Sequence, residues 1–178
     1  TNTSLPSLQG DYITDGSSQD IVLSPDGNTA FIADKQGGVH FVDVTNGASP
    51  SSYGTTGGSS NAMDIDISSD GRYLYVADQT AGLLVYDVQN VTNPVLVKTI
   101  STPGYATGII LSGDDSRAYV ADYEEGVRVY DLTDPESPVN VGNYETSSKS
   151  LKLDISNDDE ILFVANTVDV LALNVSTP

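Results

Sequence analysis

The 178-residue sequence contains no cysteine and no tryptophan, and it has only three phenylalanines and one histidine. Without cysteine, no disulfide framework, thiolate zinc site or cysteine nucleophile can form. No apolar run approaches the roughly 18–20 residues that a membrane-crossing helix needs. The motifs G-x-S-x-G, H-E-x-x-H, G-x-G-x-x-G and the Walker loop are also absent, so the sequence offers no anchor for hydrolase, zincin or nucleotide chemistry.

Basic residues are scarce, with seven lysines and arginines against 25 aspartates and glutamates, which gives a formal charge of −18. Such a charge repels phosphate backbones and anionic lipid surfaces, so we expect no nucleic-acid partner. The lack of a long apolar run predicts no membrane-spanning segment. The hydrophobic fraction of 38% is nevertheless that of an ordinary folded protein. The length suits one domain with a real core, covering residues 1–178.

The sequence repeats itself every 44 residues. Ala33, Ala77, Ala121 and Ala165 recur at this step, each followed by Asp or Asn, and other positions keep the same frame. They include Ser24, Ser68, Ser112 and Ser156, each before a turn, and Pro50, Pro94 and Pro138. We predict units at about 15–58, 59–102, 103–146 and 147–178, the last of them completed by 5–14.

Each unit contains four short runs that suit β-strands. In the second unit they are 64–67, 73–77, 83–86 and 95–100, rich in Val, Ile, Leu and Tyr and separated by turn residues. No stretch keeps an apolar period of 3.6 for three turns, so helix should be nearly absent. Near-continuous apolar strands are covered on both faces. Four such strands per repeat predict an all-β fold, a β-propeller built from four four-stranded blades.

The motifs Tyr-Val-Ala-Asp, Val-Tyr-Asp-Val and the following x-Pro-Val resemble LVIVD repeats of bacterial and archaeal surface or secreted proteins. The second and third units match best; the fourth has Asn166 and Asn174 in place of the two aspartates. The resemblance covers about residues 5–176. It implies a propeller at the cell surface or outside the cell, and it implies no reaction and no cofactor.

The frame also suggests how the propeller closes. Pro6 and Tyr12 align with the fourth strands of the other units, whereas the fourth unit has no fourth strand of its own. We expect residues 7–13 to form the outermost strand of the last blade, in the same chain or in a neighbour, because propellers avoid unpaired edges. A four-bladed ring is the simplest arrangement of one chain. The scarcity of bulky residues favours more blades, either eight from two chains or a head-to-tail polymer.

Acidic residues supply the candidate sites. One rim should gather Asp34, Asp78 and Asp122 at strand ends, together with Asp64 and the other rim residues Asp15, Asp20, Tyr105, Tyr123, Glu124, Glu125 and Lys152. Such a rim can hold Ca²⁺; alternatively, the strand-end aspartates accept backbone N–H bonds in Asx-turns. Asp66 and Asp154 should line the central channel, where they can bind a cation or simply face water.

Two further groups have simpler interpretations. The acids of the opposite rim occupy hairpin turns, where Asp is ordinary turn chemistry; they are Asp26, Asp70, Asp114, Asp115, Asp158, Asp159 and Glu160. His40 stands in a tolerant slot shared with Leu84 and Arg128, so we assign no catalytic residue.

Asn2, Asn90 and Asn174 begin glycosylation sequons, which matter only in a secreted protein. The chain begins at Thr1 rather than Met, as expected of a processed or excised product. We therefore expect a secreted or cell-surface protein.

The function expected from these features is a non-enzymatic structural or interaction module. Its partner would be another protein, a surface glycan or a second copy of the chain. The alternative is a divalent-cation-dependent propeller hydrolase or lactonase with its site on the acidic rim. Propellers do host carboxylate-based hydrolases, but no feature of the sequence selects a catalytic pair.

Overall fold

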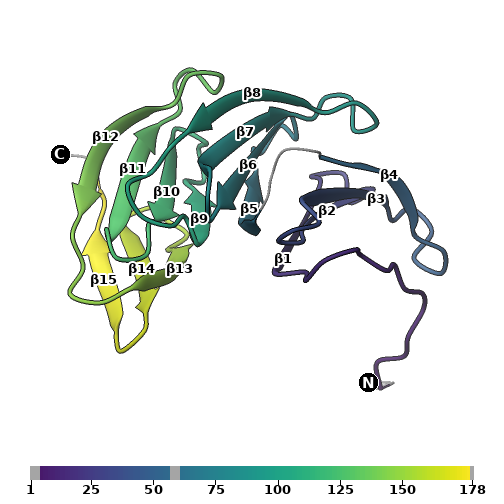
Figure 1. Ribbon diagram of the computed structural model, residues 1–178, viewed down its shortest axis with the longest axis horizontal. Helices are drawn as coiled ribbons and strands as arrows, with labels where there is room; N and C mark the ends of the chain where they lie inside the picture. Colours follow the sequence, from purple (N-terminus) through teal and green to yellow (C-terminus); the bar gives the residue numbers. More distant parts are fainter. Residues whose placement is uncertain (1–4, 57–60, 177–178) are drawn as a thin grey trace.

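The computed structural model describes residues 5–56 and 61–176, which form fifteen β-strands in four antiparallel sheets (Figure 1). Three sheets have four strands in sequence order, and the last has three. The strands are β1 (Asp20–Leu23), β2 (Thr29–Ala33), β3 (Val39–Asp43), β4 (Ser51–Thr55), β5 (Ala62–Ile67), β6 (Tyr73–Asp78), β7 (Gly82–Asp87), β8 (Val95–Ile100), β9 (Gly108–Leu111), β10 (Arg117–Ala121), β11 (Val127–Asp131), β12 (Val139–Tyr144), β13 (Ser150–Ile155), β14 (Ile161–Asn166) and β15 (Val170–Asn174). The expected all-β propeller repeat and its strands are confirmed.

Each sheet places its most apolar strands in the middle. All six residues of β6 are buried, because Val, Leu and Tyr on both faces pack against neighbouring sheets. The outer strands β4, β8 and β12 are largely exposed. Their pairing with the third strand shifts register after Phe41, Val85 and Val129, which occupy one repeat position, so the irregularity belongs to the repeat.

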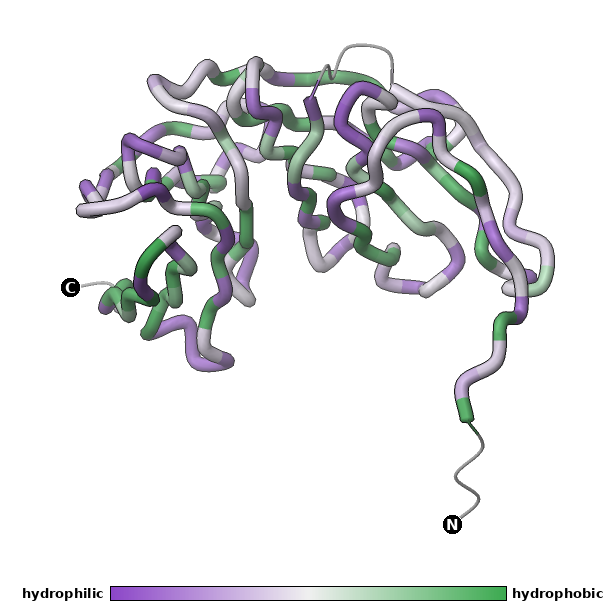
Figure 2. Tube along the Cα trace, turned by 60° about the horizontal axis from the view of Figure 1, so that its bottom comes forward, coloured by the Kyte–Doolittle hydropathy of each residue, from purple (hydrophilic) through white to green (hydrophobic). Residues whose placement is uncertain are grey.

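The core is divided into three apolar layers, each lying between two adjacent sheets. Phe31 and Phe41 of the first sheet pack with Leu74 and Val76 of the second. A second layer joins the second and third sheets, and a third joins the third and fourth. Figure 2 shows hydrophobic chain along the strands and hydrophilic chain in many of the loops. The relative placement of the sheets therefore depends mainly on side chains, with isolated backbone bridges between neighbouring sheets at Lys35–Ala62 and Tyr123–Ser150.

The four sheets follow one another along an open arc, with β1, β5, β9 and β13 on its inner side (Figure 1). A closed ring of four blades from one chain, the simplest of the expected arrangements, is therefore wrong, and a ring of more blades stays a prediction. Small residues such as Ala33 and Ala77 lie fully buried within the layers, and Ala121 is fully buried as well. Thin layers allow adjacent sheets to lie close together, so four sheets do not turn through a full circle.

The N-terminal segment does not complete the last sheet of its own chain. Residues 5–14 form no strand, and the sheet β13-β14-β15 keeps only three strands. The segment instead runs over the first sheet, where Tyr12 and Thr14 contact His40 and Asp34. The prediction of same-chain closure was wrong because the first and last sheets lie at opposite ends of the arc (Figure 1); pairing with a neighbouring chain stays a prediction.

The hairpin turns between the first and second strands repeat one hydrogen-bond pattern. Asp26, Asp70, Asp114 and Asp158 each accept a bond from the Ser hydroxyl two residues earlier, at 2.6–2.7 Å. Each also accepts from the backbone N–H two residues later. The structure thus bears out the turn role expected for these four acids, whereas Asp115 and Asp159 accept from the Ser69 and Gly113 N–H groups of the preceding hairpin turn. The described part of the chain contains no helix long and apolar enough to cross a membrane.

Candidate functional site

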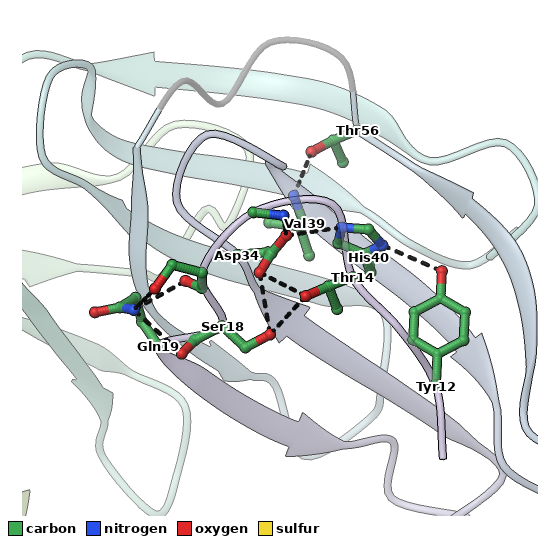
Figure 3. Close-up of polar contacts among 10 residues, drawn as sticks. Tyr12, Thr14, Ser18, Gln19, Asp34, Val39, His40 and Thr56 are labelled. Carbon is green, nitrogen blue, oxygen red and sulfur yellow. Dashed lines mark hydrogen bonds and ion pairs between the residues drawn. The ribbon is translucent and has the colours of Figure 1, made fainter.

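The strand-end aspartates lie on one rim, where the turn between the second and third strands meets the segment that enters the first. Figure 3 shows Asp34 at the centre of such a contact. Its carboxylate accepts bonds from Thr14 Oγ1 at 2.9 Å, Ser18 Oγ at 3.0 Å and the Gly16 N–H at 2.6 Å. Asp34 is fully buried, so these donors replace the water it has lost.

His40 extends this contact to the N-terminal segment. Its Nε2 lies 3.2 Å from Asp34 Oδ2, and its Nδ1 lies 3.2 Å from the Tyr12 hydroxyl (Figure 3). The Tyr12 and His40 rings meet edge to face, with centroids 5.8 Å apart. The buried Asp34–His40 pair therefore anchors Tyr12, and with it residues 10–14, to the first sheet.

Asp78 and Asp122 repeat the arrangement with different partners. Asp122 accepts from the Gly104 N–H at 3.1 Å and pairs with Arg128 Nε at 2.6 Å. Asp78 accepts from the backbone N–H groups of Asn61, Thr80 and Ala81. All three aspartates thus accept backbone N–H bonds, as expected. Of the three, Asp78 alone accepts from residues that directly follow it in the sequence, which is the geometry of an Asx-turn.

The residue six positions after each aspartate explains the difference. This slot holds His40 beside Asp34, Arg128 beside Asp122 and Leu84 after Asp78. His40 and Arg128 can donate to the carboxylate, whereas leucine cannot, so Asp78 relies on its own turn. In the sequence this position looked merely tolerant of different residues. The signal that was missed is that its two polar residues, His40 and Arg128, can both donate a hydrogen bond.

A second set of carboxylates ties the inner strands together across sheets. Asp20 Oδ2 accepts from the Ile65 N–H at 3.2 Å, and Asp64 Oδ2 accepts from the Ile109 N–H at 2.8 Å. Asp66 Oδ2 accepts in the same way from the Leu111 N–H at 2.8 Å. Each bond joins a carboxylate to a backbone N–H 45 residues further along, on the inner strand of the next sheet. The inner edge of each sheet would otherwise leave these donors unpaired.

Lys152, on the last sheet, takes part in the same set of contacts between inner strands. Positions 20, 64, 108 and 152 share one repeat frame and carry Asp, Asp, Gly and Lys. Because Gly108 has no side chain, the Lys152 ammonium can pass over β9 and form an ion pair with Asp64 on β5. A Cβ on Gly108 would lie only 2.9 Å from the Leu151 carbonyl oxygen and 3.2 Å from Lys152 Cα.

Two carboxyl groups on the inner strands, Asp64 and Asp66, have raised pKa values. Burial and a hydrogen bond with Asp20 raise the pKa of Asp64 to about 7, against the opposing effects of Lys152 and the Ile109 N–H. Burial also raises the pKa of Asp66, although the Leu111 and Ile67 N–H groups act in the opposite direction. The Asp64 carboxyl therefore titrates close to neutral pH rather than in the usual acid range.

The remaining candidates lie apart from one another. Asp154, on β13, is exposed, and its carboxylate accepts from the Ile155 N–H. Asn90 and Asn174 are exposed, and their side-chain oxygens accept bonds from Thr92 and Ser176 of their own sequons. Asn2 lies outside the described residues. Within residues 5–56 and 61–176, no three acidic or histidine side chains are grouped so as to hold a metal ion.

The repeated carboxylate contacts do not account for one hollow on the rim. It encloses about 270 Å³ and is lined by Pro103, Gly104, Tyr105, Tyr123, Glu124 and Glu125. The two tyrosine rings meet edge to face at 6.1 Å, and Lys149 Nζ lies 4.5 Å from the centre of the Tyr123 ring. Aromatic faces beside carboxylates suit a sugar ring or a cationic side chain, and in this chain Lys149 already pairs with Glu124 at 3.3 Å while lying over the Tyr123 ring.

Sequence reasoning placed Asp20, Asp64 and Lys152 on one rim, but it missed their role as ties between sheets. The recurrence of Asp at positions 20 and 64 was visible. What periodicity does not show is the register between two adjacent sheets, which share no backbone ladder.

Comparison with known proteins supports the fold. The model of the family described as LVIVD repeat matches residues 15–56, 59–102 and 103–146. A search of curated proteins finds no significant match. Among solved structures, the β-propeller domain of Myceliophteria thermophila Cps50 (Swd1) is similar with a TM-score of 0.72 at 18% identity, over 96% of this chain and 55% of that one.

Two Bacteroides proteins are also similar in structure. One from Bacteroides uniformis, provisionally described as a 6-phosphogluconolactonase, has a TM-score of 0.74 at 17% identity, over 89% of this chain and 53% of that one. A Bacteroides fragilis protein with the same provisional description has a TM-score of 0.73 at 16% identity, with the same coverage. At these identities the likeness concerns the fold alone, and the chain spans about half the length of these propellers.

Proposed function

Because this chain belongs to the LVIVD repeat family, we propose that it is a non-enzymatic structural or interaction module that works outside the cell. LVIVD repeats are typical of extracellular proteins. The observation that carries the proposal is the use of the repeated carboxylates: those in the turns, at the strand ends and on the inner strands of the first two sheets accept hydrogen bonds that hold the fold together. These hydrogen bonds give the repeated acids a structural role, since they satisfy polar groups that the fold removes from water.

The charge of −18 favours a partner with a basic surface, because complementary potentials speed association and reject acidic competitors. The hollow between Tyr105 and Tyr123 is the best candidate contact on the described surface, since it combines aromatic faces with Glu124 and Glu125. A basic protein segment or a surface glycan fits this chemistry.

A lactonase with a divalent cation on the same rim is the second candidate. It is favoured by the provisional description of the two Bacteroides propellers as 6-phosphogluconolactonases. The electrostatics speak against it, because a chain with a charge of −18 repels an anionic sugar phosphate, even though Lys149 at 3.3 Å and Arg128 at 4.0 Å partly neutralise Glu124 and Glu125 in the hollow.

Calcium titration calorimetry, thermal melts and a lactone hydrolysis assay separate the two candidates. For the interaction module we expect the same melting temperature in EDTA and in about 1 mM Ca²⁺, a concentration at which extracellular calcium sites fill, and no hydrolysis of 6-phosphogluconolactone. Calcium-dependent turnover that is lost in Glu124→Gln and kept in Glu145→Gln would overturn the proposal. Glu145 is exposed and lies outside the hollow, so it controls for the change in charge.

A further inference from the structure

The last sheet exposes an apolar face that the other three sheets bury. Phe31, Tyr75, Tyr119 and Phe163 occupy one repeat position on the second strands. The first three are 1–2% exposed because the next sheet covers them, whereas Phe163 is 43% exposed. Val170, on the neighbouring strand β15, is also exposed. The free face of the last sheet is therefore one half of an inter-sheet layer.

The first sheet exposes the complementary half. Ile21, Ile65 and Ile109 share a repeat position on the inner strands; the latter two are 4% exposed and pack against the preceding sheet, but Ile21 is 60% exposed. Beside Ile21, a groove of about 410 Å³ lies between the N-terminal segment and β1, lined in part by Tyr12 and Ile32. The exposed apolar surfaces at the two ends of the arc are thus the two complementary halves of one inter-sheet layer.

Backbone pairing is incomplete at the same two ends. β15 pairs only with β14, whereas β7 and β11 each pair with a fourth strand on their other side. Tyr12 holds the repeat position of Thr56, Ile100 and Tyr144, at the ends of the fourth strands. The bond to His40 keeps Tyr12 against the first sheet, much as Ile100 of β8 packs into the layer between the second and third sheets. The segment therefore already lies where the fourth strand of a preceding blade belongs.

We propose that two copies of this chain close one ring, in which residues 6–14 of each copy pair with β15 of the other. The chain covers 55% of one similar propeller and 53% of another, so two copies supply about the blades of one ring. The arrangement goes beyond the proposed function and does not depend on it. It forms two identical junctions related by a two-fold axis, so the contact closes instead of continuing as a filament.

The repeat defines the register of this junction. Asp87 pairs with Val95 and Asp131 with Val139 in the complete sheets. With the one-residue deletion before β15, the same frame pairs Asn174 with Ser7 of the second copy. By analogy with the bond from Leu111 to Asp66, the Leu23 N–H of one copy donates to Asp154 of the other. Phe163 packs against Ile21 across the junction.

Light scattering after size-exclusion chromatography, in about 0.5 M salt to screen the like charges, tests the proposal on the full chain. We expect a mass near twice 18.7 kDa that falls to one copy in Phe163→Asp. Val95→Asp is the matched control, because Val95 is similarly exposed but lies in a complete sheet, and it should leave the mass unchanged. A single-copy mass at all concentrations, or a series of higher multiples, would overturn the two-copy ring.

A cross-link tests the register without relying on a destabilised variant. The native chain has no cysteine. In the double variant Ser7→Cys with Asn174→Cys, the two introduced thiols are therefore the only ones that can form a disulfide. Paired antiparallel residues lie within disulfide range, and we expect a covalent two-copy species on oxidation. Ser7→Cys with Asn90→Cys, both at exposed positions but not paired, should stay single. If the first pair also failed to cross-link, pairing of the segment with β15 would be wrong.

Discussion

Replacing Asp64 with asparagine should reduce the pH dependence of the free energy of unfolding between about pH 5 and about pH 7.5. The pKa of this carboxyl is raised from 3.8 to about 7 by burial and by Asp20. The folded state therefore keeps a proton that the unfolded chain has already released. Stability from this group is fully present below pH 3.8 and is lost as the pH rises to about 7.

The size of the effect follows from the same shift. Each pH unit between the unfolded and folded pKa costs about 1.4 kcal/mol, so the native chain should lose about 2 to 3 kcal/mol across the measured range. The amide side chain of the Asp64→Asn variant still offers an oxygen to the Ile109 N–H but does not titrate. The variant should therefore become more stable relative to the native chain as the pH rises.

Urea unfolding at four pH values, for both proteins, measures this difference. Glu145→Gln is the control, because it makes the same change in charge at an exposed position outside the inner strands and outside the proposed junction. Its free energy of unfolding should differ from that of the native chain by an amount that depends little on pH. A difference for Asp64→Asn that stays constant with pH, or that moves in the opposite direction, would refute the link between burial, Asp20 and this proton.

Two further predictions concern the inner strand and the turns. Gly108→Ala should lower the free energy of unfolding by about 1–3 kcal/mol in chemical denaturation, because its Cβ would meet the Leu151 carbonyl oxygen at 2.9 Å; Gly142→Ala, with nothing within 4 Å, should not. The Ser116 N–H and the Ser112 hydroxyl lower the pKa of Asp114 from 3.8 to about 2, so its stabilisation is present above 3.8 and lost as the pH falls to 2. Ser112→Ala should therefore reduce the drop in melting temperature over this acid range, and an unchanged drop would contradict the assignment.

The strands and their order could be predicted because each unit repeats the same local signals. Apolar runs, Asp-containing turns and the Ala-Asp strand ends are properties of short segments, and four copies in one frame remove ambiguity. The same frame assigned residues 5–14 to an outer strand. It did not tell whether the last sheet that they would complete belongs to the same chain or to a second copy, because the repeat frame is the same in both cases.

Curvature could not be predicted in the same way. The angle between adjacent sheets depends on how Phe31, Leu74 and their neighbours pack in three dimensions, and a small change per layer accumulates over a ring. The scarcity of bulky residues pointed toward more than four blades, and the open arc agrees with that argument. The simpler four-bladed arrangement neglected it.

The acidic composition follows largely from the architecture. Adjacent sheets share no backbone ladder, so carboxylates such as Asp20, Asp64 and Asp66 supply the acceptors for inner-edge N–H groups. Turns and strand ends use further aspartates for the same purpose. A carboxylate whose lone pairs are occupied by N–H and O–H donors must give up those bonds before it can bind a cation. A cation or basic partner at the exposed Glu124 and Glu125 beside Tyr123 would instead compete with Lys149 and Arg128, which pair with these acids at 3.3 Å and 4.0 Å.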